Sequence, residues 1–284
     1  MKTTTVAALG WTGLAIAGGT GKYSASWTTD PSLPDHVLYA PTNPPAGLKL
    51  PVIAWGEGAC SFNGLDFQKF LIEVASYGVF IIANGSPTGG ENVNGMAETS
   101  YPNATAHRVA IDWVTKVAGT TGGKYANVDA SRLAAAGMSC GGIQSYAIGW
   151  DPRVTAIGIF NSGIKNLTDV DWPKNITKPI FYFLGGPTDI AYENGERDYT
   201  VLPATTPKWK GNLPVGHGGT YNQTNGGKFG VAAVHWARWL LRGDKSAATW
   251  FTGNGTGTAR GDGWSVAYQS LDLMKIDKID NVDA

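Results

Sequence analysis

The sequence contains little charge and almost no cysteine. Of its 284 residues, 15% are charged, and 22 basic residues balance 22 acidic ones. Because no basic patch or charge run stands out, we do not expect a nucleic acid partner. The chain has two cysteines, Cys60 and Cys140, which excludes a scaffold held together by many disulfides.

The sequence also lacks long apolar runs and metal-binding spacings. No stretch after residue 17 is long and apolar enough to cross a bilayer as a helix. The His and Cys spacings of zinc sites are missing, and so are clustered carboxylates. We therefore expect no metal, no cofactor and no membrane contact in the mature protein, and we expect a monomer.

The first 17 residues are typical of a secretory signal peptide. Lys2 precedes an apolar run over residues 6–17, and Ala15-Ile16-Ala17 fits a small-residue cleavage site before Gly18. The alternative is a buried first strand. We expect residues 1–17 to be removed and residues 18–284 to form a single extracellular domain.

Asn-x-Ser/Thr sequons follow this segment and mark candidate glycosylation sites. Five are favoured: Asn103, Asn166, Asn175, Asn222 and Asn254. A sixth, at Asn84, is the poorest, because it ends a predicted core strand and Pro87 follows its tripeptide. Together with the leader, the sequons favour a eukaryotic secretory route.

Short apolar runs alternate with segments of helical spacing along the chain. The predicted strands cover residues 50–55, 79–83, 132–136, 154–160, 179–184, 207–212 and 264–268. The predicted helices cover residues 65–77, 104–117, 140–148 and 229–241. This alternation predicts an α/β fold with a mostly parallel central sheet and helices on both faces. Functional residues in such sheets lie on loops at the carboxyl ends of the strands.

One motif in this pattern carries chemistry. Gly137-Met138-Ser139-Cys140-Gly141 is the only Gly-x-Ser-x-Gly in the sequence. A predicted strand precedes it and a predicted helix follows, which is the strand–turn–helix setting of a nucleophile elbow. The flanking glycines allow a tight turn that exposes the serine. Ser139 is therefore the candidate nucleophile, and the alternative is a glycine-rich turn with an idle serine.

A serine nucleophile needs a base and an acid that orients the base. On a nucleophile elbow these follow in the order Ser, acid, His. His217 lies between glycines on a late loop and is the candidate base, although it could be an exposed turn histidine. The other histidines are expected to be structural: His36, His107 and His235.

Asp189 is the candidate acid because it follows the predicted strand over residues 179–184. Its rivals lie farther along the chain: Glu193, Glu196 and Asp198. The alternative role for Asp189 is to cap a turn. The candidate oxyanion donors are the backbone N–H groups of Cys140 and Glu57, with Gly58 as second choice. The Glu57 side chain would then be able to meet a polar substrate group.

These motifs resemble the α/β-hydrolase superfamily. The segments that carry the resemblance are residues 51–87, 137–142, 151–163 and 184–189, within a match over about residues 37–241. They are most similar to the branch of dienelactone hydrolases and cutinase-like polyester hydrolases. Three features differ from that branch. Met138 stands where His or Trp is frequent, and the first loop reads Trp55-Gly56-Glu57-Gly58 in place of a His-Gly form. Ser139 stands where a dienelactone hydrolase has cysteine.

The resemblance implies a secreted serine esterase acting on a small or polymeric carboxylic ester. The sequence has no insertion between the late predicted strands that is large enough for a big lid, so we expect an open site. Acyl transfer to an alcohol, as in a biosynthetic tailoring enzyme, remains an alternative. Amide cleavage and a non-catalytic binding role remain alternatives as well. The aromatic residues Trp150, Tyr192 and Trp209 are candidate substrate walls, and the alternative is that they lie in the core or pack on the surface.

The resemblance also places the two cysteines together. In this fold the loop that carries Cys60 and the helix start at Cys140 meet above the sheet, within the range of a disulfide. The secretory route supplies an oxidising compartment. We therefore predict a Cys60–Cys140 disulfide beside the oxyanion hole, and the alternative is two buried free thiols.

Overall fold

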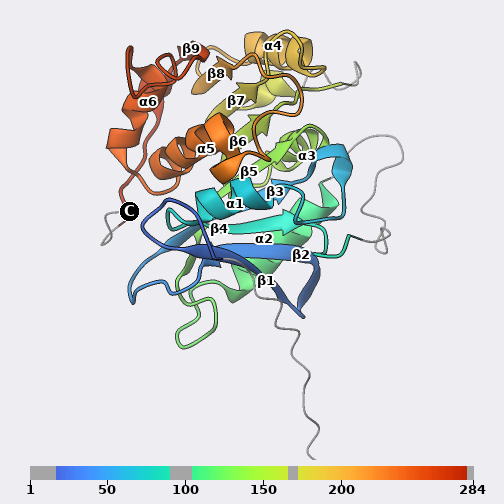
Figure 1. Ribbon diagram of the computed structural model, residues 1–284, viewed down its shortest axis with the longest axis vertical. Helices are drawn as coiled ribbons and strands as arrows, with labels where there is room; N and C mark the ends of the chain where they lie inside the picture. The colour runs from blue at the N-terminus through green and yellow to red at the C-terminus, as the bar shows by residue number, and fades with distance from the viewer. Residues whose placement is uncertain (1–16, 90–103, 166–171, 280–284) are drawn as a thin grey trace, which may run out of the picture.

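The computed structural model describes residues 17–89, 104–165 and 172–279 (Figure 1). The predicted signal peptide up to residue 16 and the sequons at Asn103 and Asn166 lie outside these residues. The three favoured sequons within them, at Asn175, Asn222 and Asn254, are exposed. No helix within these ranges is long and apolar enough to span a bilayer.

Nine strands in the described part of the chain form one sheet, in the order β1-β2-β4-β3-β5-β6-β7-β8-β9. Their bounds are β1 (Ala25–Asp30), β2 (Leu33–Pro41), β3 (Leu50–Gly56), β4 (Phe80–Asn84), β5 (Val128–Met138), β6 (Val154–Phe160), β7 (Ile180–Leu184), β8 (Lys208–Asn212) and β9 (Ser265–Gln269). Strands β3 to β8 are mutually parallel, whereas β2 is antiparallel to its neighbours and β9 is antiparallel to β8. The predicted α/β class with a mostly parallel sheet is confirmed.

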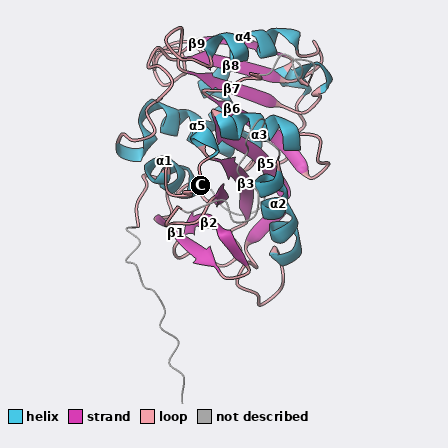
Figure 2. Ribbon diagram, turned by 90° about the vertical axis from the view of Figure 1, so that its right-hand side faces the viewer, coloured by secondary structure: helices cyan, strands magenta, loops and turns pink. Residues whose placement is uncertain are grey.

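Helices cover both faces of this sheet (Figure 2). The α-helices are α1 (Gln68–Ala75), α2 (Thr105–Val117), α3 (Cys140–Ile148), α4 (Tyr192–Val201), α5 (Gly227–Leu240) and α6 (Ala248–Thr252). Short 3₁₀ turns are η1 (Gly58–Cys60), η3 (Pro173–Asn175), η4 (Thr224–Gly226), η5 (Lys245–Ala247) and η6 (Leu271–Leu273). Helices α1, α5 and α6 pack on one face, and α2 and α3 pack on the other.

The sheet separates two apolar cores, because successive side chains of a strand point to opposite faces. Trp55 of β3 and Phe183 of β7 lie in the core beneath α1 and α5. Val52 and Tyr182 of the same two strands lie in the core beneath α2 and α3. Burial on both faces explains why these strands appear in the sequence as continuous apolar runs. Trp209 is fully buried in the first core, so it is a core residue and not a substrate wall.

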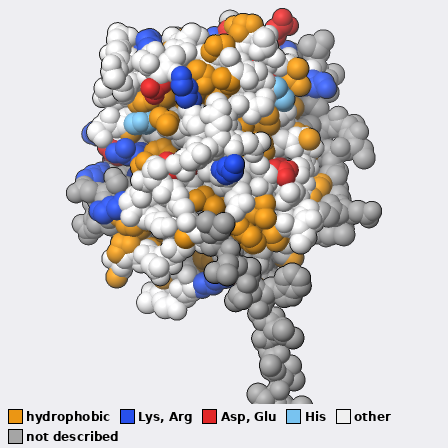
Figure 3. Space-filling view, in the orientation of Figure 1, with side chains coloured by type: hydrophobic (Ala, Val, Ile, Leu, Met, Phe, Trp, Pro, Cys, Tyr) orange, Lys and Arg blue, Asp and Glu red, His pale blue; other side chains and the backbone are white. Residues whose placement is uncertain are grey.

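Charged side chains are sparse on the surface. In the face shown in Figure 3, basic and acidic groups are scattered and do not gather into a patch of one sign. This agrees with the balanced composition. The parallel strands bring the loops that follow β3, β5, β6, β7 and β8 to one edge of the sheet, where the candidate residues meet.

Candidate active site

Ser139 sits in a strained turn between β5 and α3. Its φ of 52° and ψ of −112° lie in a region that a residue with a side chain rarely adopts. Two groups, one at the end of β6 and one just after it, hold the turn. The Ser139 N–H donates to the Phe160 carbonyl at 2.9 Å, and the Ser162 hydroxyl donates to the Ser139 carbonyl at 2.6 Å. Strain of this kind costs on the order of 1–3 kcal/mol and clusters at functional sites.

The glycines of the motif allow α3 to approach the sheet. A Cβ at Gly137 would lie 2.4 Å from the carbonyl carbon of Gly141, and a Cβ at Gly141 would lie 2.0 Å from the Gly56 oxygen. Both contacts are with backbone atoms, which cannot rotate away as a flexible side chain can. A side chain at either position would therefore displace the turn that presents Ser139.

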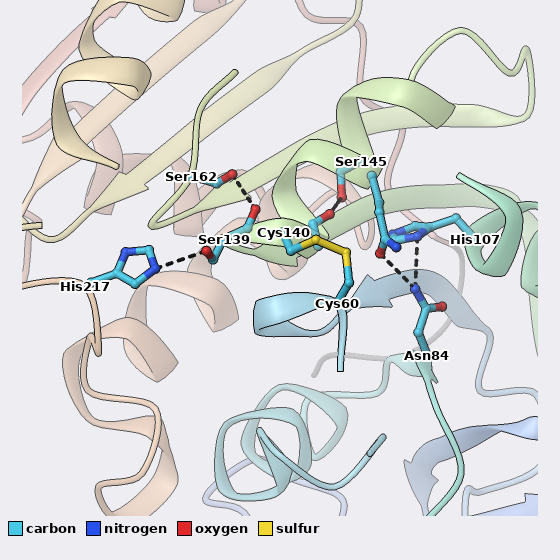
Figure 4. Close-up of a disulfide and its surroundings, with 10 residues drawn as sticks. Cys60, Asn84, His107, Ser139, Cys140, Ser145, Ser162 and His217 are labelled. Atoms are coloured by element: carbon cyan, nitrogen blue, oxygen red, sulfur yellow. Dashed lines mark hydrogen bonds between the residues drawn. A yellow bond between two sulfur atoms is a disulfide. The ribbon is translucent and has the colours of Figure 1, made fainter. Parts of the chain in front are cut away.

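The structure brings Ser139, His217 and Asp189 together in one line. His217 Nε2 lies 3.0 Å from Ser139 Oγ, and Figure 4 shows the imidazole directed at the hydroxyl. His217 Nδ1 lies 2.6 Å from Asp189 Oδ1. Ser139 follows β5, His217 lies on the loop after β8, and Asp189 lies on the loop after β7, so the sheet itself sets their separation.

Asp189 is buried and fully hydrogen-bonded. Burial raises the pKa of Asp189, but the bonds from His217, the Ala191 N–H, Asn161 and the Gly185 N–H together hold that pKa below its ordinary value. An ionised carboxylate only accepts hydrogen bonds, so His217 Nδ1 carries the N–H of the ring and donates a hydrogen bond to Asp189. Nε2 is then free to accept from the Ser139 hydroxyl, as a general base requires.

The rival acids have other partners. Glu196 pairs with Lys210 at 2.6 Å, and Asp198 pairs with Arg197 at 2.8 Å. Glu193 lies exposed in the first turn of α4. None of the three has a bond to His217 in the described part of the chain, whereas Asp189 has one.

The other histidines are held inside the fold. His36 bonds the Ala106 carbonyl, His107 bonds Asn84, and His235 stacks on Trp250 at 5.3 Å between ring centroids. Burial lowers the pKa of each of them to about 4, so they remain neutral at pH 7. Their surroundings match the structural role predicted for them.

The candidate oxyanion loop lies against the start of α3. Because α3 begins at Cys140, the N–H of that residue has no partner within the helix. The Gly141 N–H donates to the Glu57 carbonyl at 3.1 Å, which fixes the loop after β3 beside the nucleophile. The predicted disulfide is present: Cys60 and Cys140 are bonded, with Cα atoms 5.2 Å apart (Figure 4).

The disulfide should matter for turnover. It joins two segments 80 residues apart and ties the Glu57 loop to the residue after the nucleophile. We expect reduction by dithiothreitol to lower kcat roughly tenfold to hundredfold, because complete loss of one oxyanion donor costs on the order of 10²–10³. By the chain-entropy model, reduction should also lower the free energy of unfolding by about 4 kcal/mol.

Initial rates should therefore be measured well below the Tm of the reduced protein, with Cys60→Ala/Cys140→Ala as a variant that needs no reductant. Equal kcat for the oxidised protein, the reduced protein and this variant would show that the bridge has no part in the site.

The Glu57 side chain does not meet substrate, so that expectation is wrong. It is completely buried, and the Trp55 indole N–H donates to its Oε2 at 3.3 Å. Its Oε1 has no hydrogen-bond partner within the described residues. Burial raises the pKa of Glu57 well above its ordinary value, and the nearby charge of Asp66 raises it further. The carboxyl is therefore a neutral acid in the folded protein.

Glu57→Gln is expected to remove a pH dependence of stability. In the unfolded chain Glu57 ionises near 4.5, whereas the folded protein keeps the proton. Above that pH the folded state binds more protons, so the free energy of unfolding falls as pH rises. The Tm of the variant relative to the wild type should therefore increase as the pH is raised from about 4 toward neutrality. Thermal unfolding across that range checks this, and a constant difference would contradict a neutral Glu57.

A cleft of about 240 Å³ opens beside Ser139 and His217. Its walls come from the loop after β6 and from the start of α4, and its lining includes Ser162, Lys165, Ile190 and Asn194. Ile190 directly follows Asp189 and is 80% exposed, a position that the sequence did not single out. Trp150 does not line this cleft, because it lies between α3 and β6, near the amino end of β6.

A larger cavity of about 570 Å³ lies elsewhere. It is lined by residues such as Arg132, Pro179 and Pro207, near the amino ends of their strands, and by the segment around Met274. None of its lining residues belongs to the Ser139 site, so this cavity is separate from the candidate active site.

The asparagine and serine that follow β6 were missed by the sequence reasoning. Asn161 contacts Asp189, and Ser162 holds the nucleophile turn. The available signal was a polar Asn-Ser-Gly immediately after a buried strand, at the edge where functional loops gather.

No protein-family model matches the chain, and no curated protein matches it.

Proposed function

We propose that this protein is a secreted serine hydrolase of carboxylic esters, built on the α/β-hydrolase fold. The observation that carries the proposal is the hydrogen-bonded line from Ser139 through His217 to Asp189. The order Ser, Asp, His along the chain supports the fold assignment, as does the loop after β3 lying beside the nucleophile turn.

The proposed reaction begins with attack of Ser139 Oγ on the ester carbonyl while His217 Nε2 takes the hydroxyl proton. The Cys140 and Glu57 N–H groups donate to the oxyanion of the tetrahedral intermediate. His217 then protonates the leaving alcohol, which leaves an acyl group on Ser139. A water molecule attacks this acyl-enzyme while His217 takes the water's proton. The Ser139 Oγ–acyl bond then breaks, His217 returns the proton to Oγ, and the acid departs. Asp189 stabilises the imidazolium formed in each half-reaction.

Three features support secretion. The leader has the pattern of a signal peptide, the described favoured sequons are exposed, and the one disulfide requires an oxidising compartment to persist.

The modest volume of the cleft favours a short acyl or alkyl group directly at the nucleophile. Larger parts of a substrate would extend beyond it, which is compatible with a polymeric ester.

Matched substrates test the proposal. The purified protein is assayed with a p-nitrophenyl ester and with the corresponding p-nitroanilide, each with Ser139→Ala as control. We expect Ser139-dependent ester hydrolysis and little anilide cleavage. A second assay adds excess alcohol to the ester and measures the ratio of acid to new ester. Faster anilide cleavage would indicate an amidase, predominant new ester would indicate an acyltransferase, and no Ser139-dependent turnover across a panel of esters would overturn the proposal.

A further inference from the structure

Asn161 is the first residue after β6, at the edge of the sheet that carries the site. It is fully buried, with a φ of 43°. Its N–H donates to the Phe183 carbonyl at 2.8 Å, which anchors it to the neighbouring strand β7. Asparagine is among the few residues other than glycine that adopt this left-handed region readily. The residue therefore combines a special backbone position with a buried polar side chain.

The Asn161 amide connects the acid to the loop of the base. Its Nδ2 donates to Asp189 Oδ2 at 2.8 Å and to the Gly216 carbonyl at 3.2 Å. Gly216 directly precedes His217 in the chain. One amide group therefore contacts both the residue that orients the imidazole and the backbone that carries it.

Tyr221 fixes the orientation of that amide. Its hydroxyl donates to Asn161 Oδ1 at 2.5 Å, and its ring packs at its edge against Phe67 and Phe70. Burial raises the pKa of Tyr221 well above its ordinary value, and the charge of Asp189 raises it further, so the hydroxyl keeps its proton. A flipped amide would direct its oxygen at the Asp189 carboxylate and its nitrogen at a hydrogen-bond donor. Both contacts would be lost, so one orientation is strongly favoured.

The Asp189 carboxylate is held on both oxygens. Oδ1 accepts from His217 and from the Ala191 N–H, and Oδ2 accepts from Asn161 and from the Gly185 N–H. Among the described residues, Asn161 is the only side chain besides His217 that donates to it. Asn161 does not line the cleft beside Ser139, so it does not contact the proposed substrate.

We propose that Asn161, oriented by Tyr221, is a positioning residue for the proposed hydrolase and extends the Ser139–His217–Asp189 line by two members. It sets the plane of the Asp189 carboxylate and ties the His217 loop to it, so that Nε2 is directed at the nucleophile. This inference rests on the proposed function for its kinetic consequence. The geometric part concerns the His217–Asp189 bond and can be measured without turnover.

Asn161→Ala is expected to lower kcat roughly tenfold to hundredfold, since a displacement of about 1 Å can cost 10²-fold in rate. KM should change less than about twofold, because Asn161 makes no contact with the cleft. Tyr221→Phe, which removes only the hydroxyl, should also lower kcat with little change in KM, and by a smaller factor than Asn161→Ala. The double variant should be no slower than Asn161→Ala alone, because Tyr221 acts through Asn161.

A matched control is Tyr182→Phe. Its hydroxyl is also buried but bonds Tyr146 in the opposite core, so its removal should leave kcat unchanged. Unaltered kcat in Asn161→Ala would overturn the proposal, and so would strictly additive losses in the Asn161→Ala/Tyr221→Phe double variant.

Proton NMR can test the His217–Asp189 hydrogen bond directly. The proton shared by His217 Nδ1 and Asp189 should give a far-downfield signal that disappears in His217→Ala. In Asn161→Ala this signal should shift or broaden, while in Tyr182→Phe it should not. An unchanged signal in Asn161→Ala would contradict the positioning role. If the wild type shows the signal and its dependence on Asn161 but hydrolyses no ester, the proposed function fails while the positioning role stands.

Discussion

Ser139→Ala is expected to fold as the wild type does and to lose about 10³-fold or more in kcat on an ester substrate. The substitution removes only the hydroxyl that bonds His217 and that, in the proposed reaction, attacks the carbonyl. The backbone that carries Ser139 is held by Phe160 and Ser162 and does not depend on that hydroxyl. Binding and the oxyanion donors remain and account for a residual rate above that of water.

Ser145→Ala is the matched control for this experiment. Ser145 lies in α3, is completely buried, and its hydroxyl donates to the Gly141 carbonyl at 2.9 Å. It has no bond to His217 or Asp189 in the described part of the chain, so its removal should leave kcat near that of the wild type. If Ser139→Ala retained activity close to that of Ser145→Ala, Ser139 would not be the nucleophile.

His217→Ala is expected to cause a loss as large as that of Ser139→Ala. Without the imidazole, no group of the described structure bonds Ser139 Oγ to accept its proton. A double variant lacking both residues should be no slower than either single variant, because members of a triad act as one unit. Steady-state kinetics of the three proteins on one ester tests this.

His235→Ala provides the comparison for the histidine. Its ring is stacked on Trp250 and has no contact with Ser139, so any effect should appear in stability and leave kcat unchanged. A His217→Ala protein as active as the wild type would require a different base. Losses that add in the double variant would indicate that Ser139 and His217 do not work together.

Much of the sheet was predictable because the apolar runs have the length and composition of buried strands. The predicted helix over residues 140–148 matches α3, and the predicted strand over residues 154–160 matches β6. Helix α4 was missed, because its sequence contains a glycine and few apolar residues. Within it only Gly195 and Asp198 are buried, and polar contacts such as Lys210 to Glu196 attach it to the fold. Such contacts leave no periodic pattern in a sequence.

Within the Ser139 site, the residues that could be predicted are those indicated by the Gly-x-Ser-x-Gly motif and by the order Ser, acid, His along the chain. Motif and order indicated Ser139, Asp189 and His217, which the structure brings within hydrogen-bonding distance. Asn161 and Tyr221 were not found, because their importance arises from contacts between residues 28 to 60 positions apart.

The direction of the Glu57 side chain was predicted wrongly because an ionised carboxylate is expected to be exposed to solvent. In the folded protein the group avoids the cost of burying a charge by keeping its proton. A residue type alone does not indicate this, since it depends on the surroundings that the fold creates around Trp55 and Asp66.

The most direct test of the central claim is labelling with a fluorophosphonate, which reacts with an activated serine and needs no knowledge of the natural ester. The enzymatically deglycosylated protein is incubated with the probe and examined by intact-mass analysis and peptide mapping. The account predicts one adduct per chain, on Ser139, with none in Ser139→Ala and strongly slowed labelling in His217→Ala. An unlabelled wild-type protein, or an adduct on another residue, would contradict the assignment of Ser139 as an activated nucleophile.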